Sequence, residues 1–326
     1  TGTDAPAMDS LILRSCTLNL LFFSLSFFAL YFLLNALFPT HKSLVAFCLL
    51  LAYLNPISIS NTLLAREYQL SECLFTLWGV WCWKVFHRIE RGAPEWSFGT
   101  FCNGTVLSAA LLSCGYFNAL FIGLTGLCLL YCSIRHSHTC KDLLFYAALC
   151  IGSLMLCICL YQGFFNFLHD ARTMEVTDKI QGGSWTDNLL STFINGGYIV
   201  LIRMLTPIWA GVLASAIVYK LSHKKEVRLP RIPSFWLFAC ALVWTATVLW
   251  MAPWKSTRFI ASALPLCMVV AAYYSAFCLH RTPHTWKAIL VTAFIGYANM
   301  EYPIEHLERT ANCPWPAHVR RVVLFG

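Results

Sequence analysis

The sequence predicts an all-α integral membrane protein with about nine or ten transmembrane helices. Of the 326 residues, 58% are hydrophobic and only 12% are charged, which is about half the charged fraction of an ordinary soluble domain. The mean hydropathy is +0.64. A soluble fold of this length could not easily bury so much apolar side chain, so lipid is expected to cover part of the surface.

The predicted spans are apolar runs of about 17 to 25 residues that carry little or no charge. Pro39 ends the first run, and Asn55-Pro56 interrupts the second. The fourth and fifth runs follow each other with almost no linker, which predicts either a tight hairpin or an irregular pair of helices. The ten runs are 16–38, 43–62, 68–86, 97–116, 117–134, 143–164, 189–219, 234–252, 259–280 and a weaker one at 288–299.

Short basic clusters lie between these runs, as in membrane topology signals, so the net charge of +8 does not indicate nucleic acid binding. If the spans alternate, every cluster faces one side, which the positive-inside rule makes cytoplasmic. The clusters are Lys42; Lys84, Arg88 and Arg91; Arg135 and Lys141; Lys220, Lys224, Lys225, Arg228 and Arg231; and Arg281 and Lys287.

The opposite face of this multi-pass plasma (inner) membrane protein then holds both ends of the chain. Residues 1–300 form the predicted multi-span domain, with an exoplasmic loop at 165–188, and residues 301–326 form a short exoplasmic tail. Most of the acidic residues fall on this face. We therefore expect the chemistry of the protein on the exoplasmic side.

The segment before the third span is the first candidate site. Pro56 cannot donate a backbone hydrogen bond and disfavours helix at Asn55, so the chain is expected to break near the exoplasmic surface. Arg66 and Glu67 then stand at the entrance of the span that begins at Tyr68. Charges at this depth are candidates for function. The alternative is that Arg66 reaches the lipid headgroups and Glu67 caps a helix.

Two further cations, Lys255 and Arg258, lie beside Trp254 and Phe259 at the start of another span. They could hold a phosphate at the lipid surface, or form an interfacial anchor with the tryptophan. Arg203 lies deep inside an apolar run and should face the protein interior or water. It could be paired structurally or contact an anionic ligand.

No metal centre is predicted. Cys132, His136, His138 and Cys140 form one compact group, but their spacing fits no zinc pattern, and a polar loop beside a span explains them. The loop at 165–188 is rich in charges, most of which are expected to be solvated. Asn103-Gly104-Thr105 matches a glycosylation sequon, but the predicted topology places it near the cytoplasmic end of a span.

Four segments together carry a family resemblance. Leu13-Arg14-Ser15 precedes a long span, a second span ends at Asn55-Pro56, Ala65-Arg66-Glu67-Tyr68 has the form Ala-Arg-x-Tyr, and Arg258-Phe259 is followed by Pro265. This pattern resembles the dolichyl-phosphate-mannose-protein mannosyltransferase superfamily of the GT-C type. Its bacterial relatives include aminoarabinose transferases and related lipopolysaccharide-modifying glycosyltransferases. The resemblance extends loosely over residues 10–280.

The resemblance implies a GT-C-like helical bundle that transfers a sugar, with inversion, from a polyprenyl-phosphate donor to a lipid, glycan or protein at the exoplasmic face. It makes Arg66, Lys255 and Arg258 candidates for the donor phosphate, because cations stabilise charge that develops on a departing phosphate. Tyr68 belongs to the same motif, and Arg203 is a further binding candidate. No cofactor is firmly predicted, although some relatives use a divalent metal ion. The expected partners are a polyprenyl-phosphate-linked sugar and membrane lipids.

The resemblance also implies an acidic general base in a first exoplasmic loop, which would precede most of this chain. Asp4 and Asp9 are the only acids upstream of the first run, and neither lies in an Asp-Glu pair. With Glu67 they are weak candidates for the base. Two other functions stay open: a transporter or flippase of a lipid-linked intermediate, with Arg203 lining its cavity, and a non-catalytic membrane subunit.

Overall fold

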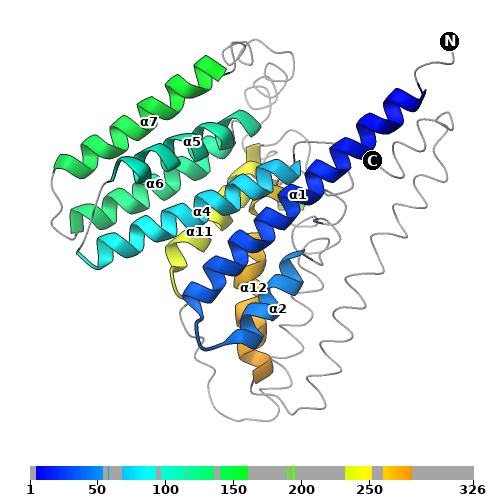
Figure 1. Ribbon diagram of the computed structural model, residues 1–326. Helices are drawn as coiled ribbons and strands as arrows, with labels where there is room; N and C mark the ends of the chain where they lie inside the picture. The colour runs from blue at the N-terminus through cyan, green and yellow to red at the C-terminus, as the bar shows by residue number, and fades with distance from the viewer. Residues whose placement is uncertain are drawn as a thin grey trace. The chain divides into compact units, whose positions relative to one another are not determined.

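A computed structural model describes residues 5–53, 58, 68–92, 97–115, 117–135, 140–160, 189–190, 193–194, 232–251 and 260–280 (Figure 1). This part of the chain is 92% helical and contains no strand, which confirms the predicted all-α class for these residues. The predicted run 288–299, the loop 165–188 and the tail 301–326 lie outside it, as does nearly all of the run 189–219. The chain divides into two compact units, which are described separately.

Unit 1 contains α1 (Ala5–Leu37), α2 (Lys42–Tyr53) and α12 (Leu264–His280). Pro39 follows the end of α1, where its ring prevents the helix from continuing, and α2 begins three residues later. Helix α2 packs against both α1 and α12. It ends at Tyr53, two residues before Asn55-Pro56, where the sequence predicts a break.

The core of unit 1 is apolar with aromatic contacts. Tyr53 lies with its ring 5.2 Å from that of Phe23, and its hydroxyl is 2.7 Å from the Ser26 hydroxyl. This pairing satisfies both polar groups in a buried position. The rings of Phe38 and Tyr273 stack at 5.4 Å between centroids, and so join the end of α1 to α12.

The apolar part of helix α1 has both a buried and an exposed face. Leu30, Leu33 and Leu34 are fully buried, whereas Phe28 and Phe32 on the same helix are at least half exposed. With a rise of about 1.5 Å per residue, the apolar segment Thr17–Leu37 is about 30 Å long, which matches the hydrocarbon core of a bilayer.

Unit 2 contains most of α4 (Tyr68–Glu90), with α5 (Phe98–Cys114), α6 (Asn118–Arg135), α7 (Cys140–Leu160), α11 (Phe235–Met251) and the short 3-10 helix η5 (Ala261–Ala263). Its core is aromatic. Phe75 of α4 stacks on Phe121 of α6, and Trp244 of α11 lies 5.0 Å from Phe75 at a tilt of 60°. Three helices therefore meet at one fully buried ring cluster.

Helices α5 and α6 form the tight hairpin that was one of the two predicted alternatives. Ser97 caps α5, because its hydroxyl accepts a hydrogen bond from the Thr100 backbone N–H at 3.2 Å. After α5 ends, the Asn118 side chain donates back to the Leu111 carbonyl at 2.9 Å. Asn118 thus satisfies one of the carbonyls that the end of a helix leaves unpaired.

Small residues bring α5 and α7 close together. A Cβ atom placed on Gly104 would lie 2.7 Å from Leu149 Cδ1, so the α7 side chain occupies the space that the glycine leaves. One turn along α5, the buried Ser108 and Ser153 hydroxyls are hydrogen-bonded to each other. Small residues four apart at a close helix crossing are typical of packing between transmembrane helices.

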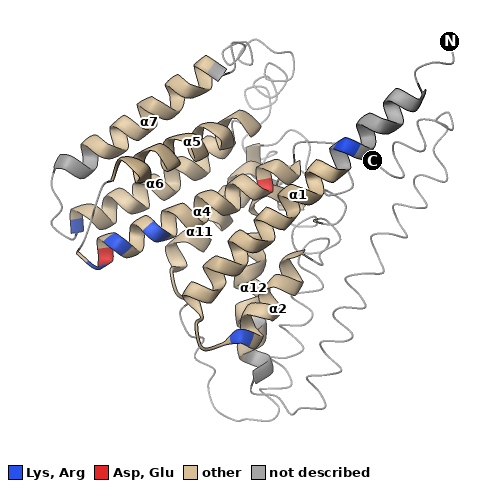
Figure 2. Ribbon diagram, in the orientation of Figure 1, with Lys and Arg blue, Asp and Glu red and all other residues tan. Residues whose placement is uncertain are grey.

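Among the described residues, two helical segments are long and apolar enough to cross a membrane: Thr17–Leu37 and Asn118–Arg135. Five other described helices are apolar but shorter than 18 residues. In unit 2, Lys and Arg gather at the end of the bundle where α4 and α6 terminate (Figure 2). The structure therefore places the cluster around Arg88 and Arg135 at the same end of unit 2.

Candidate functional site

The residues predicted to bind substrate fall mostly outside the described part of the chain. Tyr68 begins α4 and is half-buried. Asp9 lies near the start of α1. The remaining candidates are not among the described residues: Asp4, Arg66, Glu67, Arg203, Lys255 and Arg258. The structure does describe the polar residues that follow Arg66 and Arg258 in the sequence, and these residues form the candidate site.

A buried hydrogen-bond network joins the start of α4 to η5 and to the α5–α6 hairpin. The Ser71 and Ser262 hydroxyls are 2.8 Å apart, although the two residues are separated by 191 positions in the chain. The Asn118 side chain donates to Ser71 at 3.4 Å while also bonding the Leu111 carbonyl. All three polar side chains are buried, where an unpaired hydroxyl or amide would cost about 1–3 kcal/mol.

Two residues of this network follow segments that the sequence singles out as cationic. Arg66 precedes Ser71 by five residues, and Arg258 precedes Ser262 by four. Arg66 and Arg258 themselves lie outside the described residues, and the structure shows the hydrogen bond between the two serines that follow them.

Glu72 is the most unusual side chain of this region. It follows Ser71 directly and is fully buried, although carboxylates are almost never buried to this extent without a specific partner. Its backbone carbonyl accepts a hydrogen bond from Thr76 at 2.9 Å. One turn before it on the same helix, Gln69 is also fully buried. The beginning of α4 is thus a polar stretch inside an otherwise apolar fold.

Two tryptophan side chains form hydrogen bonds between elements of unit 2 near this polar stretch. Trp78, one to two turns further along α4, is buried and donates to the Thr125 hydroxyl at 2.9 Å. Trp244 donates to the Phe117 carbonyl at 2.7 Å, immediately before Asn118. Both of these indole N–H groups therefore have partners; one bond joins α4 to α6, and the other joins α11 to the residue that precedes α6.

The sequence contained one usable signal for this site. Glu72 is an acidic residue inside the predicted span 68–86, and ionisable residues within spans are candidates for function by default. Ser71, Asn118 and Ser262 gave no such signal, because serine and asparagine are common in both loops and helices. Among the described residues, no group of three or more His, Cys, Asp or Glu could hold a metal ion, while His136 and His138 lie outside them.

Comparison with models of known protein families, with curated proteins and with solved structures gave no match to this chain.

Proposed function

We propose that this protein is a membrane-embedded glycosyltransferase that moves a sugar from a polyprenyl-phosphate donor to a lipid, glycan or protein acceptor at the exoplasmic face. The observation that carries the proposal is the hydrogen bond between Ser71 and Ser262. It joins the described residues that follow the two segments whose motifs resemble the multi-span glycosyltransferases. In the proposal, cations from both segments bind one donor phosphate.

Membrane embedding is supported by the surface of the described helices. Large apolar side chains are exposed along α1 and α7, including Phe28, Leu144, Ile151 and Met155. Exposed apolar surface of this extent requires a cover in water, and lipid tails supply one. The close packing of α5 on α7 through Gly104 and Ser108 fits the same environment.

The proposed chemistry is stabilisation of a leaving phosphate. Arg66, Lys255 and Arg258 would bind the donor phosphate, since guanidinium groups grip phosphate oxygens with two hydrogen bonds and lysine adds a point charge. These contacts would strengthen as negative charge develops on the departing oxygen. The general base is not assigned; Asp4, Asp9 and Glu67 stay candidates from the sequence.

The test is binding and transfer of a radiolabelled polyprenyl-phosphate sugar by the purified full chain in detergent. Arg66→Ala and Arg258→Ala should each weaken binding about 10- to 100-fold, because each removes a charged hydrogen bond worth about 1.5–3 kcal/mol. Arg91→Ala removes an exposed cation at the other end of α4 and should leave binding unchanged. If Arg66→Ala and Arg258→Ala both bind the donor as the parent does, the proposed phosphate-binding role of these two residues is wrong.

A second pair of variants tests the network itself. Ser71→Ala and Ser262→Ala remove the bond that joins the segments, and each should lower the transfer rate while the Arg91→Ala control does not. Because both substitutions break the same contact, the double variant should lose little more than either single variant. Additive losses would show that the two serines do not act through each other.

A transporter of a lipid-linked intermediate is the second candidate, favoured by the fully buried Glu72. Carboxylates inside apolar helical bundles often serve proton or ion coupling. Glu72→Gln keeps the side-chain volume and removes the charge, whereas Glu90→Gln makes the same change at an exposed position of α4. Loss of flipping of a fluorescent polyprenyl-phosphate sugar in vesicles by Glu72→Gln alone, without any sugar transfer by the parent, would favour the transporter.

A further inference from the structure

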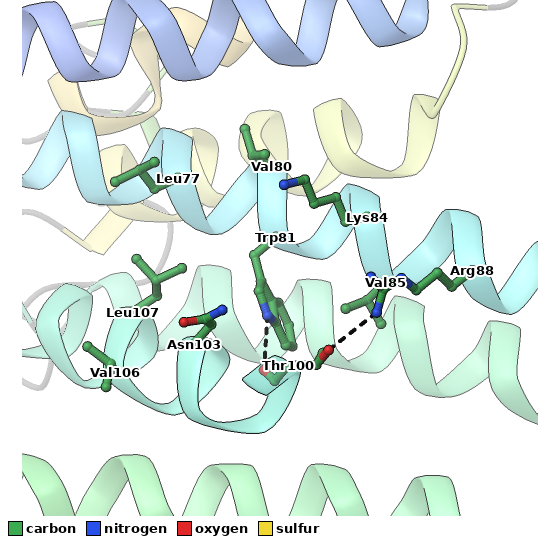
Figure 3. A pocket seen from close by; sticks show the side chains of 10 residues that line it. All are labelled: Leu77, Val80, Trp81, Lys84, Val85, Arg88, Thr100, Asn103, Val106 and Leu107. Carbon is green, nitrogen blue, oxygen red and sulfur yellow. Dashed lines mark hydrogen bonds between the residues drawn. The ribbon is translucent and has the colours of Figure 1, made fainter. Parts of the chain in front are cut away.

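A pocket of about 430 Å³ lies between α4 and α5, at the end of unit 2 opposite to the Ser71 network. Its volume falls within the usual range of ligand pockets, about 300–1,000 Å³. One part of its wall is apolar and another is polar or cationic (Figure 3). The apolar part consists of Leu77, Val80, Trp81, Val85, Val106 and Leu107.

The polar part is positively charged. Lys84 and Arg88 are exposed and lie one turn apart on α4, while Thr100 and Asn103 face them from α5. Arg88 donates to the Thr100 hydroxyl at 3.3 Å, a neutral partner that leaves the guanidinium charge uncompensated by that contact. The ten lining residues include two cations and no acid.

The nearest acid along α4 points to another side of the helix. Residues two apart differ by about 200° around an α-helix, so Glu90 and Arg88 lie on nearly opposite faces. Glu90 lies 3.9 Å from His87 on its own side. Two cations, Lys84 and Arg88, therefore line the pocket, and this favours an anionic ligand.

The shape of the pocket is fixed by rigid groups. The Trp81 indole donates to the Thr100 carbonyl at 3.2 Å and stacks on Trp78 at 4.8 Å between centroids. The tryptophan thus forms a floor between the helices. Gly104 of α5 packs directly against the same indole.

From this geometry we propose that the α4–α5 pocket binds an anionic phospholipid. Lys84 and Arg88 hold its phosphate, Thr100 and Asn103 supply further hydrogen bonds, and the first part of an acyl chain lies along Leu77, Val80 and Leu107. Basic pockets between membrane helices recognise phospholipid headgroups in this way. The proposal rests on the proposed membrane location but not on sugar transfer, and it concerns the end of α4 that the positive-inside rule assigns to the cytoplasmic leaflet.

The experiment is native mass spectrometry of the purified full chain titrated with phosphatidylglycerol or with phosphatidylcholine of the same acyl chains. We expect tighter binding of phosphatidylglycerol. Lys84→Gln and Arg88→Gln should each weaken it about fivefold, which corresponds to about 1 kcal/mol per cation near a lipid headgroup, and the double variant should weaken it more than either single variant does. Arg91→Gln and Arg135→Gln change cations at the same end that do not line the pocket and should bind as the parent does.

A variant that fills the pocket tests whether lipid binding needs the cavity itself or only the nearby surface charge. Val106→Trp leaves both cations in place, and this exposed position tolerates a large side chain in folding. It should weaken phosphatidylglycerol binding by at least fivefold, since it occupies the apolar wall. Unchanged binding by Val106→Trp, or equal losses in the Arg91→Gln control, would overturn the proposal.

Inorganic phosphate distinguishes a lipid from a free anion. Millimolar phosphate should fail to displace phosphatidylglycerol, because it cannot use the apolar wall; full displacement would overturn the lipid assignment. The sugar-transfer assay on the Lys84→Gln, Arg88→Gln chain keeps the two proposals apart. Lost lipid binding with retained transfer supports this pocket alone, whereas retained lipid binding in that chain contradicts it whatever the transfer assay shows.

Discussion

Replacement of Gly104 by alanine is the sharpest test of the helix packing. The added Cβ would lie 2.5 Å from Trp81 Cζ2 and 2.7 Å from Leu149 Cδ1, whereas carbon atoms in contact are about 3.5–4.0 Å apart. Trp81 cannot move freely, because its indole is held by a hydrogen bond to the Thr100 carbonyl. Overpacking of this kind costs about 1–3 kcal/mol, and the lost hydrogen bond about 1 kcal/mol more.

Alanine also favours helix over glycine by about 0.5–1 kcal/mol, so the net expectation for Gly104→Ala is a loss of about 1–3 kcal/mol. Gly126 of α6 is the matched control, because a Cβ there meets no atom within 4 Å. Gly126→Ala should be neutral or slightly stabilising. The measurement is reversible unfolding of the purified chain in mixed detergent micelles, followed by tryptophan fluorescence. Equal stability of the two variants would refute the α5–α7 packing.

Three further expectations test other parts of the structure. Trp244→Phe should lower the free energy of unfolding by about 1–3 kcal/mol in the same micelle assay, because it leaves the Phe117 carbonyl without its 2.7 Å donor. A mild oxidant should cross-link Cys128 to Cys240, whose sulfur atoms are 3.6 Å apart, and peptide mapping that finds neither cysteine linked would contradict the pairing of α6 with α11. Cysteines introduced near Asp178 should be labelled from outside the cell, and those near Lys224 only from inside. The reverse labelling pattern would show that the predicted topology is wrong.

Much of the pattern of the described helices was predictable where an apolar run ends at a strong breaker. Pro39 marks the end of α1, and the hairpin at Gly115 marks the boundary between α5 and α6. The exact ends were less predictable. Helix α4 extends to Glu90, four residues beyond the apolar run 68–86, because polar residues such as Arg88 and Glu90 continue a helix without needing an apolar face.

The candidate site was predictable only in its separate segments. The motifs around Arg66 and Arg258 could be found from sequence, since charges inside or beside apolar runs stand out. The contact between Ser71 and Ser262, which lie 191 positions apart, could not be predicted. No local pattern encodes a long-range hydroxyl pair; it arises only when the helices pack.

Helix α4 joins two polar regions that differ in kind. At its start, Ser71 and Glu72 are buried and their polar atoms point into the fold; at its end, Lys84 and Arg88 are exposed beside an apolar pocket. Burial is expensive for polar groups, so the first region is retained only if its bonds hold the fold or a reaction in place. The second region costs little to maintain, because exposed cations stay hydrated. Under the two proposals, variants at the start of α4 should change sugar transfer and variants at its end should change lipid binding, and each should leave the other property unchanged.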